Sequence, residues 1–296
     1  MNPTAGADRA SAYREEVTTG LSEYFPDSRI ELLHTESAED PALFGSQIQS
    51  ELILCLSGDG TIHGVLQGLM RRPRTERPAL CVLPLGSGND IARTFSIPTS
   101  PTRALPALAR GYLQAADVGS CIPDHQDEVY FLQTLSFGMD AAIALKTIEL
   151  RKHTRNREAV LYARAAVDAI VHELHTNHFH YVMDGQERRD DLLIMAIQNG
   201  PTYGGGFRVA PQARIDDGRL NLCMATRIGK LRALYYLSRM KNGTHEHLAS
   251  FQTHEIRHLI VETDKQVPTQ IDGEPIRARH YEISVRQNAI DFLRPA

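Results

Sequence analysis

Two short apolar runs, ELILCL at residues 51–56 and ALCVLPL at 79–85, constrain the fold more than any other part of the sequence. Neither run alternates polar with apolar residues, so each predicts a strand that is buried on both faces. A helical pattern, TIHGVLQGLMRR at 61–72, separates them. Buried strands separated by helices are typical of a parallel sheet covered by helices on both faces. The first part of the chain is therefore predicted to be an α/β domain.

Two further elements are predicted ahead of these strands. RIELLH at 29–34 alternates apolar and polar residues and predicts a strand. AEDPALFGSQIQS at 38–50 predicts a helix, because Pro41 is tolerated in a first helical turn. With these elements, the predicted nucleotide-binding α/β domain extends over residues 1–118.

The pattern changes after about residue 112. Two helical segments, at 140–151 and 157–174, are followed by several strands in succession, and Asp-Gly pairs mark some of the turns. Consecutive strands joined by tight turns predict an antiparallel, β-rich second domain over residues 119–296, whose last strand is a candidate to return to the first domain. The strand-like segments are GYLQAADVGSC, EVYFLQTLSFGMD, HFHYVMD, DLLIMAIQN, RLNLCMA, EIRHLIVET and HYEISVR.

Composition argues against several classes of protein. The formal net charge is −4, whereas nucleic-acid binders carry clustered positive charge. The four cysteines form no C-x-x-C pair, which argues against a zinc site or a disulfide framework. No apolar run approaches the roughly 20 residues of a membrane span, and the N-terminus lacks the apolar stretch of a signal peptide. We therefore expect a cytoplasmic protein without a transmembrane segment.

Glycine-rich turns follow both buried strands. SGDGT at 57–61 follows the first strand, and GSGND at 86–90 follows the second. Glycine lets a backbone approach a phosphate closely, and the N-terminus of the next helix supplies N–H donors. Asp59 would repel a phosphate, so its plausible role there is to act through a divalent cation. The alternative is that Gly-Asp-Gly is a sharp turn with a capping aspartate.

Six segments, taken in order, resemble the catalytic-domain family of diacylglycerol and sphingosine kinases, and more closely its bacterial soluble lipid kinases. They are NPTAG, SGDGTIHGVLQGL, LPLGSGNDIAR, FGMDAAI, APQARIDDGRLNL and IDGEPI. The resemblance covers nearly the whole chain. It implies an α/β nucleotide-binding domain, a β-rich lipid-substrate domain and an active site in the cleft between them.

The resemblance also implies which residues bind the nucleotide. ATP phosphates would lie over the first glycine-rich turn. The sequence departs from the family at Ser57, where a glycine is usual, at His63, where asparagine is common, and at NPTAG, which a buried strand normally precedes. The implied nucleotide-binding residues are Asn2, Pro3, Thr4, Ala5, Gly6, Thr35, Ser57, Gly58, Asp59, Gly60, Thr61, Ile62, His63, Ser87, Asn89 and Asp90.

Acidic residues receive the catalytic roles that the resemblance implies. Glu274 would be the catalytic acidic residue, with Asp272 beside it in the same turn. Either carboxylate could accept the proton of the acceptor hydroxyl, and Asp59 could neutralise phosphate charge through Mg²⁺. From the residues alone, DGEP is more typical of a solvated hairpin turn, and only the resemblance favours a catalytic role.

A structural magnesium site is implied at a second Asp-Gly turn. It would use the side chain of Asp217 and the main-chain oxygens of Arg214 and Arg219. Carboxylate and carbonyl oxygens are ligands that Mg²⁺ prefers. Without the resemblance, Asp217 would be interpreted as an ordinary turn residue.

The function favoured by these features is ATP-dependent transfer of a phosphoryl group to a lipid hydroxyl at a membrane surface, from diacylglycerol to phosphatidate. One alternative is an NAD kinase, which shares the Gly-Asp-Gly-Thr turn, although no serine- and threonine-rich nicotinamide-binding segment is found. A non-catalytic lipid- or nucleotide-binding regulator is the other, and the presence of both Asp59 and Glu274 argues against it. The basic stretches at 71–78 and 151–167 suit either solvated faces or attraction to anionic headgroups.

Overall fold

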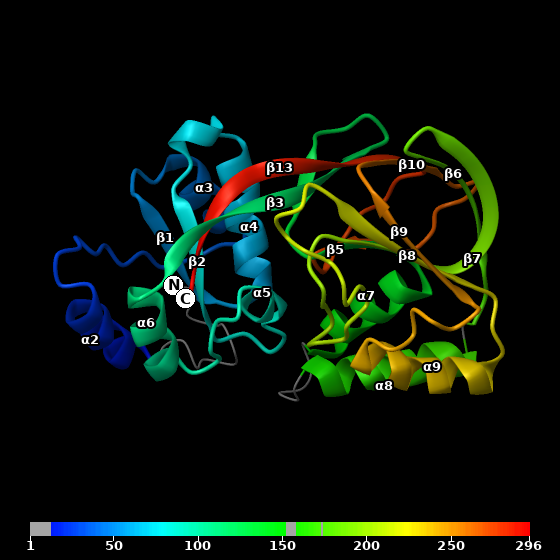
Figure 1. The fold of residues 1–296 in the computed structure, drawn as a ribbon, viewed down its shortest axis with the longest axis horizontal. Helices are drawn as coiled ribbons and strands as arrows, with labels where there is room; N and C mark the ends of the chain where they lie inside the picture. Colours follow the sequence, from blue (N-terminus) through cyan, green and yellow to red (C-terminus); the bar gives the residue numbers. More distant parts are fainter. Residues whose placement is uncertain (1–12, 152–157, 173) are drawn as a thin grey trace. The chain divides into compact units, whose positions relative to one another are not determined.

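The computed structural model describes residues 13–151, 158–172 and 174–296 of the 296-residue chain (Figure 1). The chain divides into two compact units. One contains the residues up to Ala116 together with Asn288–Ala296, and the other contains Asp117–Gln287. Two long strands, β3 (Tyr112–Pro123) and β13 (His280–Arg294), each run from one unit into the other.

The first unit is built on parallel strands. β1 (Leu52–Ser57) pairs with β2 (Ala79–Pro84) in parallel, residue for residue along both strands. β2 is buried along its whole length, and the C-terminal part of β13 pairs with it in parallel. The helices of this unit are α2 (Arg14–Tyr24), α3 (Asp40–Gln47), α4 (Asp59–Met70), α5 (Asp90–Thr94) and α6 (Pro101–Ala109), with a short 3₁₀ turn η1 (Arg74–Glu76).

This arrangement confirms the predicted α/β class of the first domain, with one correction. The segment 29–34, predicted as a strand, has no regular secondary structure. No strand of the described residues pairs with it in a sheet. Two of its apolar side chains are exposed, Ile30 at 45% and Leu32 at 40%. Alternation alone was therefore insufficient, because a strand also needs a neighbour.

The second unit is β-rich and antiparallel, as predicted. β7 is its central strand, and it pairs with β6, β5 and β8. On one side of β7 the sheet continues from β6 to β10 and then to β13, and on the other side it continues from β5 to β11 and then to β12. β9 pairs with β8. The strands are β4 (Val129–Phe131), β5 (Thr134–Gly138), β6 (Asn177–Met183), β7 (Gln186–Gln198), β8 (Leu220–Thr226), β9 (Phe251–Ile256), β10 (His258–Glu262), β11 (Thr269–Ile271) and β12 (Glu274–Pro275).

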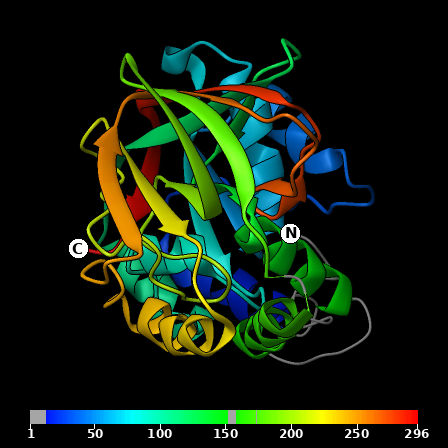
Figure 2. The ribbon, with the colours of Figure 1, turned by 90° about the vertical axis from the view of Figure 1, so that its right-hand side faces the viewer.

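Helices cover one part of this β-rich unit. Figure 2 shows α8 (Glu158–His172) and α9 (Lys230–Asn242) below the strands of this unit. Together with α7 (Met139–Arg151), they contribute side chains to a core that includes residues of β7 and β8. A second core contains the rings of Phe137, Phe179 and Tyr281 among the strands. Within the described residues, no helix combines the length and apolarity that crossing a membrane requires.

Tight turns in the second unit use the Asp-Gly pairs. Asp184-Gly185 joins β6 to β7, and Asp272-Gly273 joins β11 to β12. Both residues of each pair have positive φ, which is 45° and 96° at the second pair. Two consecutive residues of positive φ make the type of hairpin turn that favours Asp-Gly.

A carboxylate lies in the helix-covered core of the second unit. Asp140, at the start of α7, is 1% exposed and accepts hydrogen bonds from the hydroxyls of Tyr162 and Tyr203. Burial raises the pKa of Asp140 to about 6, although hydroxyl donors oppose this shift. An unfolded aspartate has a pKa of about 3.9. The protonated carboxyl therefore favours the native state, and this contribution, complete below about pH 4, is lost as pH rises through 6.

Replacement Asp140→Asn should remove this pH dependence. The stability of the variant relative to the wild type should rise by about 3 kcal/mol from acid to mildly alkaline pH, because only the wild type must ionise a buried carboxyl. Urea unfolding at several pH values measures the difference. The exposed carboxyl of Asp264 offers a control, and Asp264→Asn should show no such trend. A pH-independent difference for Asp140→Asn would contradict the assignment.

Candidate active site

The two glycine-rich loops of the first unit lie against each other. A Cβ atom on Gly86 would lie 2.6 Å from the Cα of Gly58, so only glycine permits this approach. The loop 85–89 also turns through Asn89, whose φ of 57° is left-handed and whose side chain donates to the carbonyl of Gly86 at 2.9 Å. The structure therefore brings together the two loops that the sequence placed after adjacent strands.

Asp59 joins the first loop to the second. Its two carboxylate oxygens accept the backbone N–H groups of Asp90 at 3.0 Å and Ile91 at 3.2 Å. These are the first N–H groups of α5, which have no partner within their own helix. We call a carboxylate that accepts backbone N–H groups of another segment in this way a carboxylate clamp. Asp59 thus has a structural role beside its predicted role toward a cation, because a carboxylate offers about four acceptor sites.

The N-terminus of α4 is open to a ligand at Gly60. Its capping position is Gly58, which has no side chain to accept the first N–H groups of the helix. A Cβ on Gly60 would meet no atom of the described residues within 4 Å, and Gly60 is exposed. Thr61 is half-buried next to it, with a hydroxyl suited to a phosphate oxygen. Backbone N–H groups and a helix dipole at such a place favour an anion.

Other predicted nucleotide residues lie deeper. The side chains of Ser57 and Ile62 are fully buried, and His63 is 7% exposed beside Gln67. The backbone of Ser57 does not have a positive φ, so a serine fits where the family usually has glycine. Asp90 is also buried, with an ion pair to Arg93 at 2.9 Å.

The remaining residues predicted to contact the nucleotide lie partly inside and partly outside the described part of the chain. Ser87 is half-buried in the second loop. Thr35 is half-buried just before the turn in which Asp40 accepts the N–H groups of Glu36 and Ser37. The predicted NPTAG contacts, Asn2, Pro3, Thr4, Ala5 and Gly6, lie outside the described residues.

Asp272 forms a second carboxylate clamp, within the second unit. Its oxygens accept the backbone N–H groups of Leu132 at 2.8 Å, Gln133 at 3.0 Å and Thr134 at 2.9 Å. The N–H of Asp272 returns a bond to the carbonyl of Thr134 at 2.9 Å. Three backbone donors hold this carboxylate in place, so it is poorly suited to collect a proton from a substrate.

Glu274 differs from Asp272 in each of these respects. It is exposed on β12, opposite Ile271, and within the described part of the chain its carboxylate has no hydrogen-bond or ion-pair partner. Gly273 separates the two acids with a φ of 96°. Of the two carboxylates, Glu274 therefore has the accessibility that a general base needs.

The predicted magnesium position contains two neighbouring aspartates. Asp117 is 1% exposed and accepts the N–H of Gly218 at 2.6 Å, while Asp217 accepts the N–H of Arg219 at 3.0 Å. Burial raises the pKa of Asp217, and the carboxylates of Asp117 and Glu255 raise it further. A cation at this position would relieve the repulsion.

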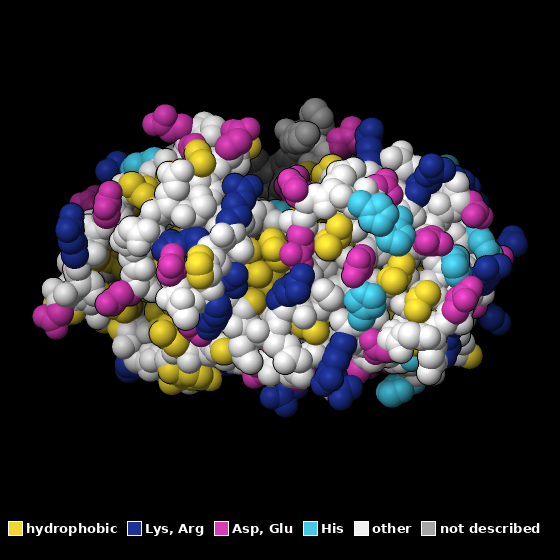
Figure 3. All heavy atoms as spheres, turned by 90° about the horizontal axis from the view of Figure 1, so that it is seen from above, with side chains coloured by type: hydrophobic (Ala, Val, Ile, Leu, Met, Phe, Trp, Pro, Cys, Tyr) yellow, Lys and Arg dark blue, Asp and Glu magenta, His cyan; other side chains and the backbone are white. Residues whose placement is uncertain are grey.

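Several histidines lie on the surface of the second unit, with acidic side chains among them (Figure 3). The ring of His180 lies 2.8 Å from Glu187 and 3.0 Å from Glu262, and His178 lies 3.1 Å from Asp191. No group of three or more ligating side chains suited to a metal ion occurs among residues 13–151, 158–172 and 174–296. The histidines of this surface therefore pair with carboxylates.

Sequence reasoning missed the partners of these acids. Asp117 could have been noticed, because it is the one charged residue of the run AADVGSC. The loop 132–134 carries no comparable signal, since it contributes backbone N–H groups only.

Two family models match the chain. Residues 1–121 match the diacylglycerol kinase catalytic domain, and residues 133–294 match the YegS C-terminal NAD kinase beta sandwich-like domain. A curated relative from Yersinia pestis (strain Pestoides F), named probable lipid kinase YegS-like, is 29% identical over 247 residues, which cover 82% of this chain and 78% of the relative.

Solved structures share the fold. A crystal structure from Bacillus anthracis str. Sterne has a TM-score of 0.82 at 22% identity and covers 99% of this chain and 93% of its own. Another from that organism, described as a diacylglycerol kinase, has a TM-score of 0.74 at 20% identity, over 99% and 94% of the two chains. An NAD kinase from Archaeoglobus fulgidus in complex with ATP has a TM-score of 0.55 at 13% identity, over 96% and 90%. At these identities the likeness shows the two-domain fold.

The two acids of the DGE turn should differ in their effect on stability. Asp272→Asn should lower the free energy of unfolding by about 1–3 kcal/mol, because an amide leaves at least one buried N–H without a proper acceptor. Glu274→Gln should leave it unchanged within about 0.5 kcal/mol, as is usual for an exposed position. Urea unfolding of both variants measures this. Equal losses, or a loss at Glu274 alone, would contradict the clamp.

Proposed function

Because the chain belongs to the family that joins a diacylglycerol kinase catalytic domain to a YegS-type C-terminal domain, we propose that it transfers the γ-phosphoryl group of ATP to a lipid hydroxyl, with diacylglycerol as the acceptor. Phosphatidate and ADP are then the products. The observation that carries the proposal is the open N-terminus of α4, held beside the second glycine-rich loop by Asp59. Such a cradle suits the phosphates of a nucleotide.

The residues divide the chemical work of the transfer. Backbone N–H groups around Gly60 and the hydroxyl of Thr61 bind phosphate oxygens of ATP. Glu274 accepts the proton of the acceptor hydroxyl as its oxygen forms the new bond to the γ-phosphorus, and the bond to the β-phosphate oxygen breaks to release ADP. Most of the catalysis is positioning and charge stabilisation, because phosphoryl transfer needs little covalent help from the protein.

Mg²⁺ is part of the proposal in two places. With nucleotide it would neutralise phosphate charge, and the carboxylate oxygens of Asp59 are ligands of the kind that it prefers. At the Asp217 turn, the carboxylate and the main-chain oxygens of Arg214 and Arg219 are oxygen ligands of the preferred kind. The carboxylates of Asp117 and Glu255 add to the effect of burial in raising the pKa of Asp217, so a cation at this position would reduce the repulsion among them.

A panel of acceptors tests the function directly. With labelled ATP and Mg²⁺, detergent-dispersed diacylglycerol should be phosphorylated in preference to monoacylglycerol, ceramide, sphingosine and NAD. Glu274→Gln should lower kcat on the preferred lipid by roughly a hundredfold or more, since general-base catalysis contributes on this scale, with little change in ATP affinity. Phosphorylation of NAD alone would favour an NAD kinase, whose fold this chain shares. A near-normal kcat for Glu274→Gln would assign the base elsewhere.

A carboxylate at position 60 should repel the nucleotide. Gly60→Asp places a negative charge beside the proposed phosphate site, and a repulsion of about 1–4 kcal/mol corresponds to roughly fivefold or greater loss of ATP affinity. Gly60→Asn has the same size without the charge and serves as the matched control. The space around Gly60 predicts unchanged melting temperatures for both. Equal ATP affinities of the two variants, measured by calorimetry, would place the phosphates elsewhere.

The Asp217 turn has a separate test. Mg²⁺ should raise the melting temperature of the wild type, because a ligand of the native state stabilises it by mass action. In Asp217→Asn the rise should shrink or vanish in the absence of nucleotide. An unchanged Mg²⁺ response would make Asp217 an ordinary turn residue.

A further inference from the structure

Helix α9 carries apolar side chains on two faces. Ala233, Tyr236 and Met240 are buried and contribute to the core beneath the helix. Leu231 and Tyr235 lie outside that core and are 86% and 53% exposed. A surface helix needs one apolar stripe to dock on its own domain, and its other face is normally polar. The second stripe of α9 is therefore surplus to the fold.

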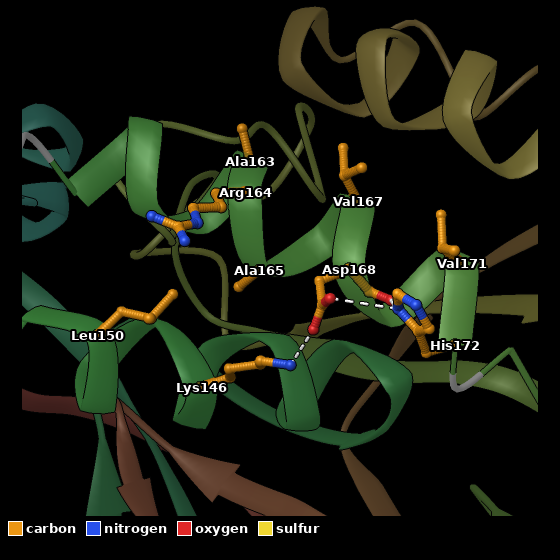
Figure 4. A pocket seen from close by; sticks show the side chains of 9 residues that line it. All are labelled: Lys146, Leu150, Ala163, Arg164, Ala165, Val167, Asp168, Val171 and His172. Atoms are coloured by element: carbon orange, nitrogen blue, oxygen red, sulfur yellow. Dashed lines mark hydrogen bonds and ion pairs between the residues drawn. The ribbon is translucent and has the colours of Figure 1, made fainter.

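Helix α8 continues this apolar surface. Figures 1 and 2 show α8 and α9 side by side, and the Nζ of Lys230 donates to the carbonyl of Val171 at 2.6 Å. Val167 and Val171 are 43% and 41% exposed and point toward the α9 side of α8 in Figure 4, whereas Asp168 points to Lys146 of α7. The same valines line a groove of about 590 Å³ between α7 and α8. We define the α8–α9 face as Val167, Val171, Leu231, Leu234 and Tyr235 with the cations of α9.

The charged side chains that α9 contributes to this face are all positive. α9 contains Lys230, Arg232, Arg239 and Lys241 and no acidic residue. On α8, Asp168 is engaged by Lys146 and His172. Exposed leucine and tyrosine among cations are the composition of a helix that lies in the headgroup region of a membrane, where tyrosine favours the interface and cations meet anionic lipids.

We propose that the α8–α9 face binds the surface of a bilayer that contains anionic lipids. Leu231 and Tyr235 enter the headgroup region, and Lys230 and Arg232 contact lipid phosphates. The inference deepens the proposed function and rests on it in part, because a kinase of diacylglycerol must meet its acceptor at a membrane. It assigns the docking surface to an element that contains none of the predicted catalytic residues.

Vesicle binding tests the face directly. The purified chain is sedimented with vesicles of phosphatidylcholine alone and of phosphatidylcholine mixed equally with phosphatidylglycerol. It should bind the anionic vesicles in preference and release as salt rises. Leu231→Ser combined with Tyr235→Ser should weaken binding about tenfold or more, on the scale of one buried leucine. Arg232→Gln should weaken it about fivefold. Leu43→Ser, at a leucine 44% exposed on α3, is the matched control and should bind like the wild type.

Detergent-dispersed diacylglycerol separates this proposal from the kinase assignment. The Leu231 and Tyr235 variant should keep the wild-type rate on that substrate, and its rate on diacylglycerol in vesicles should fall with vesicle binding. A variant that still binds vesicles like the wild type would overturn the membrane face, whatever the kinase activity. The membrane face would also be overturned if sedimentation equilibrium shows a dimer for the wild type and a monomer for the variant, because the face would then be a subunit interface. A chain that binds vesicles through this face but phosphorylates no lipid would instead overturn the proposed function.

Discussion

The site depends on carboxylates that accept backbone N–H groups from distant segments. Asp59 holds the start of α5, which is 31 and 32 residues away, and Asp272 holds the loop 132–134, about 140 residues away. A hydrogen bond to a charged group stabilises more than a neutral one, at about 1.5–3 kcal/mol. Asp117 makes a related contact to the N–H of Gly218. An aspartate is short enough to fix the backbone it touches, so these clamps set the positions of the loops.

A division of roles follows within each glycine-containing turn. In the first, Asp59 builds the turn, while Gly60 and Thr61 remain accessible at the N-terminus of α4. In the second, Asp272 builds the turn, while Glu274 remains accessible on β12. The motif aspartates therefore explain the geometry, and their neighbours carry the ligand contacts that we propose. The capping alternative for Asp59 and its predicted role toward a cation do not exclude each other, because a carboxylate offers about four acceptor sites.

Sequence patterns predicted the features that depend on the composition of a single segment. β2 was predicted from its composition because burial on both faces requires apolar residues throughout, whereas β1, predicted to be equally buried, is only half-buried in its first three residues. The strand predicted at RIELLH was wrong, because a strand forms only beside a neighbouring strand, and no local pattern encodes that neighbour. The clamp partners were equally beyond prediction, since any residue other than proline offers a backbone N–H. Helix α9 was not predicted from the sequence, because its two apolar stripes and its cations obscure a single amphipathic pattern. The same composition marks its exposed side as a candidate binding surface.

Amide hydrogen exchange at the start of α5 tests the carboxylate clamp most directly. In the wild type, the N–H groups of Asp90 and Ile91 are bonded to Asp59 and should exchange slowly. In Asp59→Asn they should exchange at least about tenfold faster, which corresponds to the loss of about 1.4 kcal/mol, while amides in the middle of α4 keep their protection. If the two amides exchange equally fast in both proteins, Asp59 does not hold the second loop.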